Sequence, residues 1–172
     1  MTKQTGFTII ELLVVISVIS LISSVILTAV GSAREKAKDS KRLAEKNEVI
    51  KAMQFYFDDH GTFPPTPTTN YWACVAPSSE SCYLGTLNGD DSLVTALTPY
   101  LPVLPTNNVP IGTWPHNRMT YKANAAAGNV CPQCPAGAYL MWVQQGTITS
   151  SECVGLRGYS VPFWYCIEHL GR

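Results

Sequence analysis

Six cysteines are the residues of this chain whose type and spacing could do chemistry. Two of them form Cys131-Pro-Gln-Cys134, the spacing used in thioredoxin-like redox sites. That chemistry needs the first cysteine at a helix N-terminus, where its pKa falls. Pro135 follows directly, then Ala and Gly, so we expect no helix here. Zinc would need a second closely spaced ligand pair, and Cys153 and Cys166 are separated by twelve residues.

Structural disulfides are the preferred use of these cysteines. An even number of cysteines, all after residue 70 in a part of the chain rich in Pro and Gly, indicates disulfides formed in an oxidising compartment. Six cysteines allow fifteen connectivities. The preferred pairs are Cys74–Cys82 and Cys153–Cys166, which leaves Cys131–Cys134 by elimination. Pairs that join 131 or 134 to 153 or 166 are the alternative.

Other catalytic constellations are absent from the sequence. His60, His116 and His169 are scattered, and the chain has neither a nucleophile elbow nor a glycine-rich phosphate loop. We therefore expect no enzyme activity, no cofactor and no metal site. The formal net charge is zero and no basic cluster lies beyond residue 51, so nucleic acid is not indicated as a partner.

A single carboxylate near the N-terminus is the other residue that demands a chemical explanation. Residues 7–30 are long and apolar enough to cross a bilayer, and Glu11 is the only charged side chain among them. A carboxylate inside a membrane costs about 2.5–3.5 kcal/mol on insertion scales, so it marks a functional site whose partner must be found. A secretory signal peptide would have a shorter apolar core, and an ordinary membrane anchor gives no reason for Glu11.

The N-terminal sequence KQTGFTIIELLVVISVISLI resembles the prepilin signal of type IV pilins and type II secretion pseudopilins. The resemblance implies that a prepilin peptidase cuts after Gly6 on the cytoplasmic side and that the new N-terminus, Phe7, is methylated. Glu11 is then the fifth residue of the mature chain, as in that family. The new Phe7 amine is a cation about 6 Å of helix rise from Glu11. We expect it to pair with Glu11, within one subunit or between neighbours, and to set the register of a filament.

The remaining residues of the apolar run offer a packing surface. Small hydroxyl side chains recur there at steps of three and four residues, the spacing that lets helices approach closely in lipid. They are Ser17, Ser20, Ser24 and Thr28. The alternative is that each hydroxyl bonds back to a carbonyl of its own helix.

The rest of the chain predicts an α+β fold of the pilin kind. A helix from residue 7 to residue 57 would have a membrane-spanning first half (7–30) and an amphipathic second half (31–60), ended by Gly61. Residues 61–172 would form a disulfide-stapled domain outside the cytoplasm, with 1–6 as the leader. A short helix capped by Asp90 or Asp91 precedes three strand-like runs at 119–123, 138–144 and 159–167. We expect these strands to form a small antiparallel sheet on the amphipathic half of the helix.

The flanking charges disagree with this orientation. The flank after the apolar run carries five basic residues, whereas Lys3 stands alone before it. The positive-inside rule would therefore place the flank after the apolar run, and not the N-terminus, in the cytoplasm. The cysteine pattern and the implied leader processing outweigh that rule. We expect a single-pass protein of the bacterial inner membrane with a cytoplasmic N-terminus, which moves into a surface or periplasmic filament.

A structural subunit of a type IV pilus-like filament is therefore the predicted function. Its partners would be further copies of the chain, the prepilin peptidase and methylase, the inner-membrane assembly machinery and, before assembly, membrane lipid. The alternatives are a major or minor pseudopilin of a type II secretion system and a membrane-anchored redox or zinc protein. Major pseudopilins often have an acidic calcium site in a late loop, and only Glu152 and Glu168 follow Asp91 here, which favours the pilus.

Overall fold

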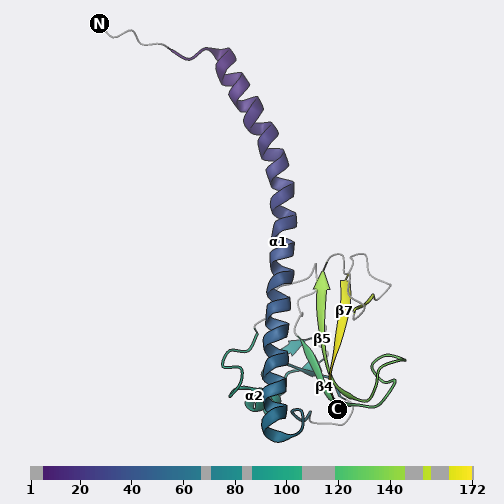
Figure 1. Ribbon diagram of the computed structural model, residues 1–172. Helices are drawn as coiled ribbons and strands as arrows, with labels where there is room; N and C mark the ends of the chain where they lie inside the picture. The colour runs from purple at the N-terminus through teal and green to yellow at the C-terminus, as the bar shows by residue number, and fades with distance from the viewer. Residues whose placement is uncertain are drawn as a thin grey trace. The chain divides into compact units, whose positions relative to one another are not determined.

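A long N-terminal helix and a small antiparallel sheet make up the computed structural model (Figure 1). It describes residues 6–66, 71–82, 87–105, 119–145, 153–155 and 163–171, with the backbone alone described at 28, 81, 144–145, 153–155 and 163–165. The chain divides into two compact units, Met1–Lys38 and Asp39–Arg172. The predicted α+β class is confirmed.

Helix α1 covers Ile9–His60 and continues through Gly31 without interruption. Its predicted end is confirmed: Gly61 adopts φ of 70°, and its N–H donates to the carbonyl of Phe57 at 2.7 Å. Only a residue without a Cβ adopts this left-handed conformation at little cost, so the helix stops here. The helix begins two residues later than predicted and ends three residues later.

The sheet has five strands in the order β1-β4-β5-β7-β6, and every neighbouring pair is antiparallel. Three strands match the predicted runs: β4 (Thr120–Ala125), β5 (Gly137–Gln145) and β7 (Phe163–Gly171). The last of these starts four residues later than predicted, and residues 159–162 lie outside the described part. Two short strands were not predicted, β1 (Ala73–Cys74) and β6 (Cys153–Gly155).

A second helix and a hairpin-like pair complete the fold. Helix α2 covers Asp91–Leu97, and the Asp90 side chain caps it by accepting hydrogen bonds from Ser92 N–H at 2.9 Å and Leu93 N–H at 3.4 Å. Of the two residues that the sequence offers as the cap, the structure uses Asp90. Strands β2 (Ser81–Cys82) and β3 (Leu87–Asn88) pair with each other.

The larger hydrophobic core of the second unit lies between α1, α2 and the sheet. In α1 it is formed by Val49, Ala52 and Met53, which recur at helical spacing and are at most 1% exposed. The same core contains Leu97 of α2 and Leu140 of β5. Burial of this apolar face therefore fixes the second half of α1 against the sheet, as predicted (Figure 1).

Candidate processing and assembly site

The predicted cleavage point lies outside the helix. Gly6, Phe7 and Thr8 are not helical, and α1 begins at Ile9. Phe7 is 85% exposed, and a Cβ placed on Gly6 would meet nothing within 4 Å. The Gly6–Phe7 peptide therefore lies in open chain rather than in a hydrogen-bonded turn, a conformation that a peptidase can bind.

Glu11 bonds the start of its own helix. Its Oε2 accepts the Thr8 N–H at 2.8 Å and the Thr8 hydroxyl at 2.7 Å, while the Glu11 N–H donates to Thr8 Oγ1 at 3.3 Å. This reciprocal pattern is a capping box, in which a Thr at the N-cap and a Glu three residues later satisfy each other's free N–H groups. The role of Thr8 was not predicted, although Thr-x-x-Glu before an apolar run is the signature of this motif.

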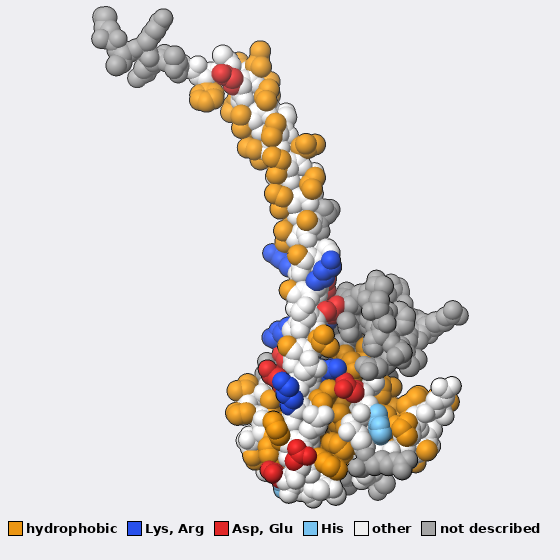
Figure 2. Space-filling view, viewed as in Figure 1, with side chains coloured by type: hydrophobic (Ala, Val, Ile, Leu, Met, Phe, Trp, Pro, Cys, Tyr) orange, Lys and Arg blue, Asp and Glu red, His pale blue; other side chains and the backbone are white. Residues whose placement is uncertain are grey.

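An apolar surface follows the capping box. Every large apolar side chain from Phe7 to Val30 is exposed, and apolar side chains cover this part of α1 (Figure 2). Within the described part of the chain, α1 is the one helix long and apolar enough to cross a membrane. This surface needs an apolar environment, which lipid or other helices can provide.

The small hydroxyl residues of this surface bond to their own backbone. Ser17 and Ser20 each donate to the carbonyl four residues earlier at 2.7 Å, and Ser24 donates to the carbonyl of Leu21 at 2.8 Å. These hydroxyls are thus satisfied without a second helix, which leaves their small surfaces available for close packing. Thr28 lies in α1, and its side chain is outside the described residues.

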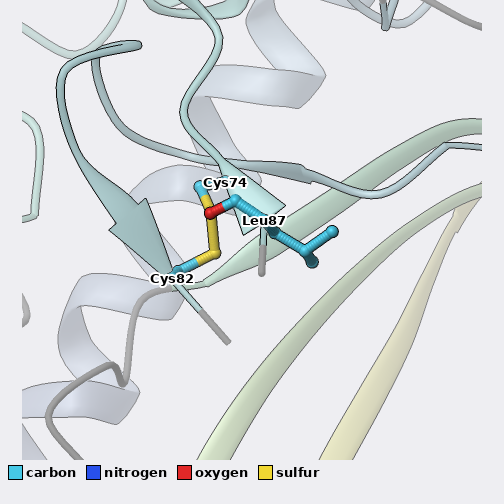
Figure 3. The surroundings of a disulfide bond; sticks show 3 residues. All are labelled: Cys74, Cys82 and Leu87. Carbon is cyan, nitrogen blue, oxygen red and sulfur yellow. A yellow bond between two sulfur atoms is a disulfide. The ribbon is translucent and has the colours of Figure 1, made fainter. Parts of the chain in front are cut away.

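Two disulfides of the second unit have both cysteines within the described residues. Cys74–Cys82 connects β1 to β2 with a Cα–Cα distance of 6.0 Å, and both cysteines are fully buried. Figure 3 shows this disulfide beside the carbonyl oxygen of Leu87, which lies 3.2 Å from Cys74 Sγ. Strands β1 and β2 have two residues each and cannot form much of a core, so the disulfide holds this region in place.

The second disulfide, Cys131–Cys134, closes a turn. The Cys134 N–H donates to the Cys131 carbonyl at 3.0 Å, and Gly128 N–H donates to the Cys134 carbonyl at 2.9 Å. Cys131 is therefore not at the start of a helix, the position that thioredoxin-like chemistry needs.

The third pair of cysteines is only partly described. Cys166 is disulfide-bonded, and its backbone register partner across β6 and β7 is Cys153. The side chain of Cys153 is outside the described residues, so the Cys153–Cys166 pair stays a prediction. Among the residues that are described, no group of three or more His, Cys, Asp or Glu could hold a metal ion.

The comparison with protein families decides what the N-terminal features are. The model of the prokaryotic N-terminal methylation motif matches residues 1–27. This chain carries a prokaryotic N-terminal methylation motif. The motif contains the open Gly6–Phe7 peptide, the capping box of Thr8 and Glu11, and most of the exposed apolar surface. The resemblance noted in the sequence is confirmed.

Two relatives extend the likeness beyond the methylation motif. The type IV wide pilus major component PilA4 of Thermus thermophilus is 26% identical over 129 residues, which cover 68% of this chain and 98% of the relative. A fimbrial protein of Neisseria meningitidis serogroup B is 34% identical over 97 residues, 55% of each chain. No solved structure matches this chain.

Beyond the methylation motif, the structure places a charged pair that the sequence did not indicate. Lys46 of α1 is only 8% exposed; its Nζ donates to Glu168 Oε2 of β7 at 2.7 Å and lies 4.5 Å from the ring centroid of Trp142 in β5. A buried lysine needs such partners because its charge loses water. No local pattern could show this pair, since its two members are 122 residues apart.

Proposed function

We propose that this protein is the structural subunit of a type IV pilus-like filament. The observation that carries the proposal is the methylation motif on a chain whose motif region exposes an open peptide bond and an unbroken apolar helix surface. The names of the two relatives, a pilus component and a fimbrial protein, support the same assignment. As a structural subunit it acts by assembly, without a catalytic site.

Processing would begin in the inner membrane, where residues 7–30 span the bilayer with the N-terminus in the cytoplasm. Prepilin peptidase would cut the Gly6–Phe7 bond, which lies outside α1 and is therefore available without unwinding a helix. Methylation of the new Phe7 amine would follow. Residues 61–172 would remain outside the cytoplasm, where the disulfides are stable.

Assembly would place the apolar half of α1 in the filament core. Lipid is as apolar as the side chains of this surface, so burial alone does not favour moving the helix from lipid into the filament core. The transfer depends on close packing between helices. The small residues at these contacts would be Ser17, Ser20, Ser24 and Thr28. Glu11 would supply a specific ionic contact between neighbouring subunits. One of its oxygens, Oε2, is used by Thr8, and the carboxylate keeps further lone pairs for the methylated amine at Phe7 of a neighbouring subunit.

The mature N-terminus tests the proposal. We expect mass spectrometry of the protein from its native cells to find a chain that begins with methylated Phe7. Replacement of Gly6 by Val should leave the full-length precursor in the membrane, because the branched side chain would occupy the peptidase site that a glycine leaves open. A mature chain that still carries residues 1–6, in a wild-type cell that produces filaments, would contradict the proposal.

A pilus and a secretion pseudopilus would share this processing, so a second measurement separates them. A pilus subunit should be recovered by shearing in filaments that extend from the cell surface, and electron microscopy with an antibody against this chain would show them. Recovery of the methylated chain only from the cell envelope, at native expression, would assign it to a pseudopilus instead.

A further inference from the structure

An open groove lies in the second unit between the end of α1 and helix α2. Its volume is about 610 Å³, and Tyr56, His60, Pro65, Thr95 and Tyr100 are among its lining residues. We name it the Tyr56–Tyr100 groove. Nothing in the processing or the packing of the apolar helix uses it.

Aromatic rings form much of the Tyr56–Tyr100 groove. The rings of Tyr56 and His60 stack with centroids 4.0 Å apart, and the ring of Tyr100 meets Tyr56 edge to face at 6.1 Å. Ring faces attract Lys and Arg side chains, whose apolar stems also pack on them. The aromatic lining of the Tyr56–Tyr100 groove therefore suits a long cationic side chain.

The charges at the groove have the matching sign. Asp91 lines it, Asp59 accepts a hydrogen bond from the Tyr100 hydroxyl at 2.5 Å, and none of the lining residues is Lys or Arg. This bond to the ionised Asp59 raises the pKa of Tyr100 to about 12. Asp58 and Asp59 also lie in the last turn of α1, where the helix dipole disfavours negative charge. A cation from another chain would offset this unfavourable charge at the helix end.

A basic segment of the same chain provides the complement. Between residues 34 and 41 the sequence has four basic and two acidic side chains. Of these, Arg34, Lys36 and Lys41 are exposed, and Lys41 also pairs with Glu45 of its own helix at 3.6 Å. The segment directly follows the apolar run, so every subunit would present it beside the filament core.

We propose that the Tyr56–Tyr100 groove of one subunit binds the basic segment 34–41 of a second copy. The proposal rests on the proposed function, because two different patches of one chain that fit each other make a head-to-tail contact, and such contacts generate open filaments rather than closed dimers.

Zero-length cross-linking between labelled copies tests the contact directly. Full-length chain would be produced in unlabelled and ¹⁵N-labelled form, mixed in detergent or co-assembled, and treated with a carbodiimide, which joins only a lysine and a carboxylate in contact. We expect cross-links from Lys36 or Lys41 of one isotope to Asp59 or Asp91 of the other. Their absence from both filaments and detergent-solubilised chain would overturn the proposal, as would cross-links that join the groove only to another protein.

Charge-changing substitutions provide a second test of the contact. Thr95→Lys adds a cation to the groove without removing a carboxylate, and we expect it to lower filament yield and cross-linking by about fivefold, the size of one exposed ion pair. Lys36→Glu and Lys41→Glu together in a second chain should also lower filament yield and should remove the cross-links that these two lysines form. Asn124→Lys, the same charge change at an exposed residue of β4 that does not line the groove, is the matched control.

The outcomes separate this inference from the proposed function. Filaments with a methylated N-terminus but no cross-links, or a Thr95→Lys chain that assembles as the wild type does, would overturn the groove contact and leave the pilus subunit standing. A chain without the methylated N-terminus would overturn the pilus subunit, and the cross-links in detergent would still decide the groove. Wild-type filament yield from the Lys36→Glu, Lys41→Glu chain would likewise overturn the groove contact.

Discussion

Thr8 and Glu11 hold each other in both directions at the start of α1. The Thr8 N–H and hydroxyl reach one carboxylate oxygen of Glu11, and the Glu11 N–H returns to the Thr8 hydroxyl. A carboxylate that the sequence presents as an unpaired charge in an apolar helix thus has a partner within its own subunit. Glu11 has two separable properties, an acceptor that starts the helix and a charge that can meet a neighbour.

Two substitutions should separate these properties. Glu11→Gln keeps an acceptor for the Thr8 N–H, because Gln serves in a capping box, but loses the charge. We expect unchanged hydrogen exchange of the first-turn amides and a large loss of filaments. Thr8→Ala keeps the charge but destabilises the helix start by about 0.5–2 kcal/mol. We expect faster exchange in the first turn and a smaller loss of filaments, measured on full-length chain in detergent and on sheared cells.

Thr8→Ser is the control for this pair, since serine caps a helix as well as threonine does. It should match the wild type in both measurements. Normal filament yield from Glu11→Gln would show that the carboxylate acts only as a cap, and the proposed pairing with Phe7 of a neighbour would then be wrong.

The Cys74–Cys82 disulfide should contribute strongly to the free energy of unfolding, although the loop that it closes is short. Both sulfurs are buried, and they connect elements with too few ladder hydrogen bonds to persist alone. We expect the double variant Cys74→Ala, Cys82→Ala to lower the free energy of unfolding by about 2–4 kcal/mol. Denaturant unfolding of the full-length chain, followed by tryptophan fluorescence, measures it.

The other described disulfide provides the comparison. Cys131 and Cys134 are only partly buried and close a turn that backbone hydrogen bonds already hold. Their double alanine variant should lose less stability, since a shorter closed loop restricts the unfolded chain less. A larger loss here than at Cys74 and Cys82 would contradict our account.

The sequence was most informative where structure is local. The end of α1 follows from Gly61, and the cap of α2 follows from Asp90, because helix termini depend on residues within one turn. The long strands β5 and β7 were visible as runs of aromatic and β-branched residues. The capping box was equally local and could have been found from Thr8 and Glu11 alone.

What the sequence could not show depends on long-range pairing. Strand β1 has two residues and exists because Ala73 and Cys74 lie opposite Tyr121 and Thr120 of β4. A run of two residues has no periodicity to detect. The Tyr56–Tyr100 groove likewise joins side chains more than forty positions apart, so only the fold brings them together.

The contact between Lys46 and Glu168 is a long-range feature with a measurable energy. Breaking a fully buried ion pair costs about 3–5 kcal/mol, and Glu168 is partly exposed, so we expect Lys46→Met to cost about 1–3 kcal/mol. A double-mutant cycle with Glu168→Gln should give a coupling of about 1 kcal/mol. Lys51→Met, at an exposed position of the same helix, is the control. Additive losses would show that Lys46 acts only through its packing on Trp142.

Lys122 of β4 presents the opposite case, a buried cation without a carboxylate. It is 2% exposed, its Nζ donates to Asn129 Oδ1, and it lies 5.6 Å from the ring centroid of Trp72. The ion pairs among the described residues include none to Lys122. Burial therefore lowers the pKa of Lys122, because the charged form loses water in the folded chain.

This lowered pKa predicts a stability that rises at alkaline pH. Between the folded pKa and the unfolded value of about 10.4, the unfolded chain binds more protons than the folded one, so raising the pH favours folding. Lys122→Met removes this titration. We expect the variant to gain stability relative to the wild type at neutral pH, and the difference to shrink as the pH approaches 10. Denaturant unfolding of both chains from pH 7 to pH 10 measures it, and a difference independent of pH would show that Lys122 folds with its charge fully compensated.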